Sequence, residues 1–282
     1  MLLRRELNND ISHFVTTKAD SVRPASSRQA NFVSTKCYFM KKLIFFLSLT
    51  ISAICHGQQR DTYLFVPGAW DGGWDYAKVD SILSAHGNIV YRPTLTGLGE
   101  RVHLANPGIN LTTYINDIRN LMQFEDLHNV ILVGHSYGGM VISGVAEQVP
   151  GRIKQLIYLD AMVPNDGESA KDVCGDLWAP MTQGNIKDSM VLYPFGTTPK
   201  DVPQPLNTFI EPVKLSNPLA RKIPAVFIQM TKDGKGSPAH DKMGIARAKE
   251  RKWKIYSLEG GHYAMREQPE NLVKKLEEIT QH

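Results

Sequence analysis

Cysteine is scarce in this 282-residue chain, which holds only three. Cys37 and Cys55 lie among the first fifty-seven residues, which leaves Cys174 as the one cysteine of the remaining body. A single cysteine forms no disulfide within its own chain, so a folded body must be held by its apolar core. At about 225 residues, the body is long enough to bury one large core without dividing into two domains.

The body also lacks a surplus of charge of either sign. The whole chain carries a net charge of +4, but residues 1–57 contain eight Lys or Arg against three Asp or Glu, a net of +5. Residues 58–282 therefore carry a net charge of −1. A nearly neutral body argues against a nucleic-acid partner, which needs a concentrated positive surface. We interpret the basic stretch 242–254 as the solvated face of a helix.

The apolar run 43–54 is too short to span a membrane. It has twelve residues, whereas a membrane-spanning helix needs roughly 20. It follows Lys41 and Lys42 and leads to small residues around Gly57, which predicts a signal peptide over 40–57 rather than a buried helix. We expect cleavage near Gly57, export to the periplasm or the medium, and no stable membrane insertion afterwards. Residues 1–39 are polar, and we interpret them as a disordered or wrongly assigned extension upstream of Met40.

Short apolar runs alternate with helical patterns along the body, 58–282. Residues 162–222 interrupt this alternation, are rich in proline, and are expected to form a small cap inserted before the last two strands. The remaining order predicts an α/β fold, with a mostly parallel central sheet covered by helices on both faces. Strands are expected at 63–66, 88–91, 130–133, 156–159, 225–230 and 254–258, and helices at 74–86, 111–124, 138–149 and 270–279.

Motifs for metals and nucleotides are missing. There is no Cys-x-x-Cys, no His-Glu-x-x-His and no phosphate-binding glycine loop, so we expect neither a metal nor another cofactor. The chain has instead the pattern G-x-S-x-G around Ser136, placed after an apolar strand and before a helix. In that context the turn pushes the serine hydroxyl out above the sheet. Ser136 is therefore the candidate nucleophile, and it needs a base within hydrogen-bond reach.

The base and the acid are expected in the chain order Ser…Asp…His. His262 follows the last strand directly and is the candidate base. Asp233 comes three residues after the strand that ends at Met230, and it is favoured as the acid that orients the imidazole. Asp160, at the end of an earlier strand, and Asp241 are its rivals.

Backbone amides are needed to hold the oxyanion of such a reaction. Tyr137, next to the nucleophile, supplies one by its position, and Ala69 in the loop after the first strand is the choice for the other. The candidate residues for the wall of the substrate pocket are Trp70, His135 and Trp178.

Over about residues 61–280 the chain resembles the α/β-hydrolase superfamily. Within it, the resemblance is to the compact group of plant methyl-ester esterases, hydroxynitrile lyases and bacterial esterases, some of which act on pyrethroids, and it is closest to the bacterial esterases. The resemblance implies Ser136, Asp233 and His262 as the triad and Ala69 and Tyr137 as the oxyanion hole. The segments that carry it are 66–74, 94–101, 134–139, 158–161 and 261–265.

Two departures from the group are informative. Many relatives have His-Gly where this chain has Pro67-Gly68, so the oxyanion loop is supported differently. The lyases carry a lysine after the catalytic histidine and a threonine before the oxyanion residue, where this chain has Tyr263 and Gly68. These positions argue against cyanohydrin cleavage.

The sequence thus predicts a serine esterase that cleaves small to medium hydrophobic carboxylic esters through an acyl-enzyme. A small-molecule ester is the expected partner. The alternatives are a hydroxynitrile lyase-like C–C lyase and a ligand-binding relative without turnover. The oligomeric state is not predicted.

Overall fold

The computed structural model describes residues 60–194, 200–237 and 241–281, without the side chains of Asp241 and Lys242. The expected signal peptide and the extension before it lie outside these residues.

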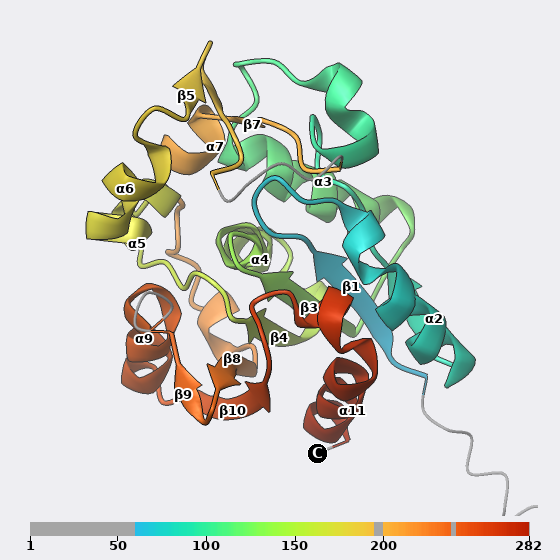
Figure 1. Ribbon diagram of the computed structural model, residues 1–282. Helices are drawn as coiled ribbons and strands as arrows, with labels where there is room; N and C mark the ends of the chain where they lie inside the picture. The colour runs from blue at the N-terminus through green and yellow to red at the C-terminus, as the bar shows by residue number, and fades with distance from the viewer. Residues whose placement is uncertain (1–59, 195–199, 238–240, 282) are drawn as a thin grey trace, which may run out of the picture. The chain divides into compact units, whose positions relative to one another are not determined.

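Six parallel strands form the central sheet, in the order β10-β8-β4-β3-β1-β2 (Figure 1). A two-residue strand, β9 (Lys235–Gly236), pairs antiparallel with the end of β8. All six predicted strands are present, and the mostly parallel α/β fold is confirmed. Their bounds are β1 Thr62–Val66, β2 Ile89–Tyr91, β3 Val130–His135, β4 Ile153–Leu159, β8 Ala225–Lys232 and β10 Lys254–Glu259.

Helices cover both faces of the sheet because successive residues of each strand point to opposite sides. Along β1, Leu64 and Val66 belong to one core cluster and Tyr63 and Phe65 to the other. The first face is covered by two long helices, α3 (Leu111–Phe124) and α4 (Gly138–Gln148), and by the short helix α9 (Ala246–Glu250). The second face is covered by α2 (Ala77–Ala85), α10 (Ala264–Glu267) and α11 (Pro269–Thr280).

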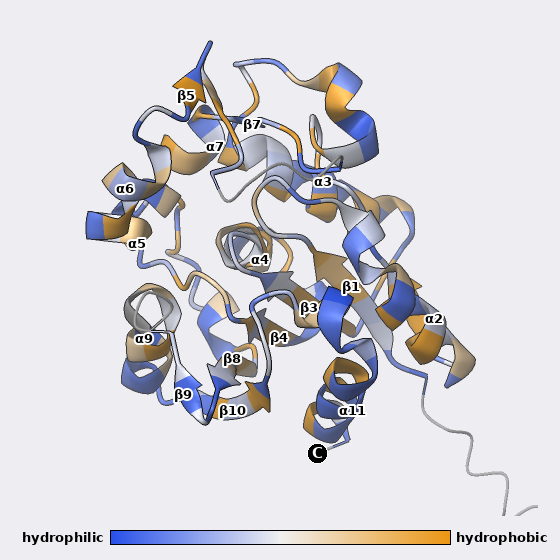
Figure 2. Ribbon diagram, viewed as in Figure 1, coloured by the Kyte–Doolittle hydropathy of each residue, from blue (hydrophilic) through white to orange (hydrophobic). Residues whose placement is uncertain are grey.

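The two helices α2 and α11 come from opposite ends of the body and pack side by side (Figure 1). On α11, Leu272, Val273, Leu276 and Ile279 are buried, and Figure 2 shows this apolar stripe against a hydrophilic outer face. Among the described residues, no helix has the length and apolar character needed to cross a bilayer. The described body also contains short 3₁₀ helices at Gly73–Tyr76, Gly99–Leu104, Pro150–Arg152, Gly175–Leu177 and Ala220–Lys222 and a short π-helix at Asp241–Ile245.

The expected cap, 162–222, folds into short elements between β4 and β8 (Figure 1). Three two-residue strands form a small antiparallel sheet in the order β5-β6-β7. The cap contacts the loop after β1, where Trp70 Nε1 donates a hydrogen bond to the carbonyl oxygen of Val191 at 2.8 Å. Its elements are α5 Ala170–Cys174, α6 Trp178–Thr182, β5 Ile186–Lys187, β6 Met190–Val191, β7 Gln204–Pro205 and α7 Asn207–Ile210.

Candidate active site

Ser136 stands on a sharp turn between β3 and α4. Its φ is +51°, a left-handed conformation that non-glycine residues seldom adopt and that concentrates at functional sites. The turn is crowded: a Cβ at Gly134 would lie 2.7 Å from the Gly138 carbonyl oxygen, and one at Gly138 would lie 2.6 Å from that of Val66. Glycine on both sides therefore allows the strand and the helix to approach closely enough to project the hydroxyl.

His262 follows β10 and is oriented by a buried carboxylate. Its Nδ1 lies 2.7 Å from Oδ2 of Asp160, whose side chain is 1% exposed. Because the carboxylate accepts, this hydrogen bond holds the proton of the neutral imidazole on Nδ1 and leaves Nε2 as the basic atom. The backbone is held as well, since His135 Nε2 donates to the His262 carbonyl oxygen at 2.9 Å.

Asp160, and not the expected Asp233, is the partner of His262. Asp233 is exposed, and its backbone N–H donates at 2.6 Å to Glu259, which fixes the turn after β8. Asp160 is buried at the end of β4, and the Met230 N–H donates to its second oxygen at 3.4 Å. The sequence-based assignment of Asp233 is corrected accordingly. For the other rival, Asp241, the side chain lies outside the described residues.

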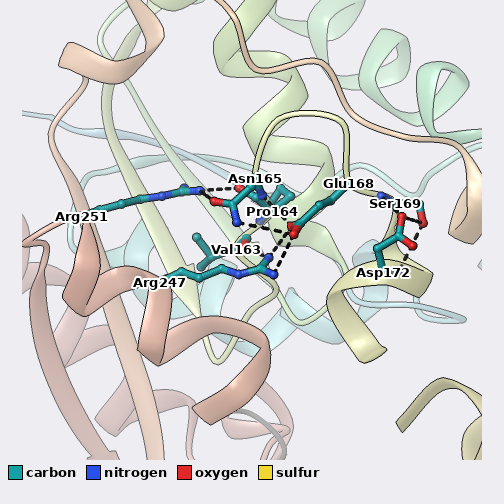
Figure 3. Close-up of polar contacts among 8 residues, drawn as sticks. All are labelled: Val163, Pro164, Asn165, Glu168, Ser169, Asp172, Arg247 and Arg251. Atoms are coloured by element: carbon teal, nitrogen blue, oxygen red, sulfur yellow. Dashed lines mark hydrogen bonds and ion pairs between the residues drawn. The ribbon is translucent and has the colours of Figure 1, made fainter. Parts of the chain in front are cut away.

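The segment after Asp160 is fastened by two arginines, as Figure 3 shows. Arg247 donates to the carbonyl oxygen of Val163 at 2.7 Å and to both oxygens of Glu168, at 2.6 and 3.0 Å. Arg251 donates to the carbonyl oxygen of Pro164 and to Asn165 Oδ1 at 3.0 Å. The solvated helix face expected for this basic stretch is therefore wrong at Arg247 and Arg251, which are partly buried and hold the entry to the cap.

Two backbone amides next to Ser136 lack acceptors in the described part of the chain. They are those of Ala69 and Tyr137, residues that are 7% and 0% exposed. Both residues line one cavity together with Ser136 and His262. Buried N–H groups are nearly always paired, so two unpaired ones beside a serine form a site that can bind a negative oxygen.

The cavity that contains these groups has a volume of about 430 Å³ and a mostly apolar wall. Trp70, a candidate residue for the pocket wall, lines this cavity. His135 is buried behind it and supports the His262 backbone, and Trp178 packs instead on Phe209, with ring centroids 5.6 Å apart. The remaining wall is formed by Asp71, Met162, Cys174, Leu177, Pro180, Met181, Asn185, Pro194, Phe209, Met243 and Tyr263.

Sequence reasoning missed a charged group that bonds Asp71, a residue of the cavity wall. Arg266 donates to Asp71 at 2.9 Å and to Asp75 at 2.6 and 2.9 Å, and both carboxyl groups are buried. Burial raises the pKa of Asp71 well above its usual value, and the neighbouring Asp75 raises it further. The Arg266 guanidinium, which donates to the same carboxyl group, lowers this pKa and so acts in the opposite direction. No local pattern in the sequence pointed to this contact, because Arg266 and Asp71 are 195 positions apart in the chain.

Cys174 also lines the cavity but is not a competing nucleophile. Burial raises the pKa of its thiol to about 12, so the thiol is neutral near pH 7. Among the described side chains, no group of three or more His, Cys, Asp or Glu is arranged to hold a metal ion.

The family model described as the alpha/beta hydrolase family matches residues 63–275. The chain belongs to this family.

Sequence relatives include esterases from bacteria and plants. A carbendazim hydrolyzing esterase of Nocardioides sp. (strain SG-4G) is 48% identical over 107 residues, which are 38% of this chain and 44% of that protein. The match thus spans less than half the length of this relative. A pheophorbidase of Raphanus sativus is 28% identical over 204 residues, 62% of this chain and 78% of its own.

Solved structures share the fold over nearly their whole length. The methylesterase MES16 from Arabidopsis is 25% identical with a TM-score of 0.60, over 78% of this chain and 99% of its own. The pyrethroid hydrolase PytH is 21% identical with a TM-score of 0.61, over 78% of this chain and 96% of its own, and this likeness shows the fold alone.

Proposed function

We propose that the protein is a serine esterase that hydrolyses carboxylic esters through an acyl-enzyme. The observation that carries the proposal is the 2.7 Å hydrogen bond from Nδ1 of His262, a residue that lines the same cavity as Ser136, to the buried Asp160. One bacterial relative is a carbendazim hydrolyzing esterase and one solved plant relative is a methylesterase, which supports the same conclusion.

The proposed mechanism assigns one task to each group. Ser136 Oγ attacks the ester carbonyl, and Nε2 of His262 takes its proton and delivers it to the leaving alcohol. Asp160 holds the imidazole in the required tautomer and stabilises the imidazolium. The Ala69 and Tyr137 amides bind the oxyanion of each tetrahedral intermediate. A water, deprotonated by His262, then releases the acid and restores Ser136.

The cavity wall supports small to medium hydrophobic esters as substrates. Phe209, Met162, Met181 and Met243 form apolar surface around Ser136. The volume of about 430 Å³ lies within the range of sites for drug-sized molecules.

Turnover of a panel of p-nitrophenyl esters of increasing acyl length, with Ser136→Ala as the matched variant, tests the proposal. We expect hydrolysis by the wild-type protein and a loss in kcat of roughly 10⁴-fold or more in Ser136→Ala. A fluorophosphonate probe should label the wild type at Ser136 and leave the variant unlabelled. A folded wild-type protein without turnover, or an equally active Ser136→Ala, would contradict the assignment.

We also propose that the body is exported after removal of residues 40–57. The support is the short apolar run behind a lysine pair. N-terminal sequencing of the protein from its native cells should start near Gln58. Retention of residues 40–57 on the mature protein would contradict cleavage, and peptides from 1–39 would contradict Met40 as the start.

A further inference from the structure

The cap is hydrogen-bonded to both segments that supply the oxyanion amides. Trp70, the residue after Ala69, donates its backbone N–H to Gln204 Oε1 at 2.8 Å. Tyr137 donates its hydroxyl to the Thr208 carbonyl oxygen at 2.6 Å. Gln204 begins β7 and Thr208 lies in α7, so one short piece of the cap touches both halves of the oxyanion hole.

Gln204 and Thr208 are also bonded to each other. Gln204 Nε2 donates to Thr208 Oγ1 at 2.7 Å, and that hydroxyl donates in turn to the Pro205 carbonyl oxygen at 2.7 Å. Both side chains are 0% exposed. The orientation of the Gln204 amide is fixed, because the Trp70 N–H can only donate and therefore requires the oxygen of the amide.

The two amides differ in how the sheet holds them. Tyr137 follows the turn at Ser136, whose N–H donates to the Leu159 carbonyl oxygen and whose own carbonyl accepts from Met162. The Ala69 segment lies beyond the end of β1, and Trp70 has a φ of +65°. Trp70 is held by the cap through its N–H and through its indole, which donates to Val191.

We propose that Gln204 is a positioning residue for the oxyanion hole, acting with Thr208 to fix the Ala69 amide relative to the Tyr137 amide. This inference rests on the proposed esterase function. An oxyanion donor stabilises negative charge that develops only in the transition state, and it must be correctly placed to do so. The hydrogen bonds of Gln204 and Thr208 should therefore raise kcat and have little effect on KM.

The central test replaces Gln204 by methionine, which has a similar size and neither the acceptor nor the donor. We expect kcat on p-nitrophenyl esters to fall about 10- to 100-fold, with KM changed by less than about threefold, since a full oxyanion donor is worth roughly 10²–10³ in kcat. Affinity for a trifluoromethyl ketone, whose serine adduct carries an oxyanion, should fall by the same factor as kcat.

The matched pair Thr208→Val and Thr208→Ser separates the hydroxyl from the volume of the side chain. Valine should lower kcat and serine should restore it. Thr182→Val, which removes a buried hydroxyl that bonds Trp178 within the same cap, is the control and should leave kcat unchanged. If Gln204→Met does not fold, as judged by thermal melting, the Thr208 pair decides the question.

The outcomes separate the two proposals. A folded wild-type protein that turns over no ester overturns the proposed function. Ester turnover that is unchanged in Gln204→Met and in Thr208→Val overturns the positioning role alone. A loss confined to KM, or an equal loss in Thr182→Val, also overturns it, because that result would indicate general damage to the cap.

Discussion

Two loops of the molecule, one after β4 and one after β8, present an aspartate near His262, and only one of them builds a site. Asp160 and Asp233 share a left-handed backbone, with φ of +45° and +52°, and border the same surface hollow as His262. Asp160 is 3% exposed and bonds His262, whereas Asp233 is exposed. Both aspartates lie between Ser136 and His262 in the chain and have the same backbone conformation, so burial is what distinguishes Asp160 from Asp233.

The position of each strand in the sheet explains the difference. β4 lies between β3 and β8, so the residue that follows it is enclosed by both neighbours, and Asp160 donates its N–H to the Ile228 carbonyl oxygen of β8. The end of β8 instead turns back as the β8–β9 hairpin, which carries Asp233 into solvent. A buried carboxylate with fixed hydrogen bonds is preorganised, and an exposed one is not.

The largest expected effect contrasts asparagine at the two positions. Asp160→Asn should lower kcat on p-nitrophenyl esters about 10⁴-fold, because an amide does not hold the required tautomer of His262. Asp233→Asn should leave kcat within about twofold, as expected for an exposed surface substitution. Steady-state kinetics on proteins of equal thermal stability gives both values.

The double variant makes the contrast stricter. If Asp233 takes no part, Asp160→Asn combined with Asp233→Asn should be no slower than Asp160→Asn alone. A further loss in the double variant would indicate that Asp233 replaces Asp160 when the latter is absent. The reverse ranking of the single variants would restore the assignment made from sequence.

An intermediate effect is expected from the contacts that fasten each loop. Arg247→Met removes the ion pair between Arg247 and Glu168, whose side chains are only 18% and 26% exposed, respectively. The variant leaves the Glu168 carboxylate without this partner. We expect a loss of about 1.5–3 kcal/mol in the free energy of unfolding. Lys249→Met, on the exposed side of the same helix, is the matched control and should not change the melting temperature.

The corresponding contact of the second loop is Glu259, which accepts from Thr231 Oγ1 and from the backbone of Asp233. Because Glu259 is exposed, Glu259→Gln should lower the melting temperature less than Arg247→Met does. Equal shifts, or a larger one in Glu259→Gln, would show that the loop after β8 is as strongly fastened as the loop after β4.

Local patterns in the sequence were sufficient for the sheet and for the turn at Ser136. The apolar runs predict buried strands, and the spacing of apolar residues predicts helices with one buried face. The glycines of G-x-S-x-G indicate a close approach of strand and helix. Fold class and strand positions could therefore be read from residues near one another in the chain. The two-residue strand β9 could not, because it depends on pairing with β8.

The site required contacts between distant residues. Asp160 and Asp233 both follow strands, and the choice between them depends on sheet order, which one sequence does not reveal. In the sequence, Arg247 and Arg251 are indistinguishable from exposed surface charges, because their hydrogen-bond partners in the segment 163–165 are distant in the chain. Gln204 gave no signal either, since the amide that it binds lies 134 positions earlier in the chain.

The smallest effect is expected within the turn after β8, where two adjacent residues both have positive φ. Asp233→Gly relieves the backbone strain of a left-handed conformation, which glycine tolerates, but glycine also loses more entropy on folding. Because these two effects oppose each other, the free energy of unfolding should change by no more than about 0.5 kcal/mol. Gly234→Ala adds a methyl group where no atom lies within 4 Å, yet φ is +71°. Its cost, about 1 kcal/mol, should therefore come from the backbone alone. Urea unfolding of the two variants measures both values, and a loss in Asp233→Gly larger than that in Gly234→Ala would mean that the Asp233 carboxylate stabilises the fold after all.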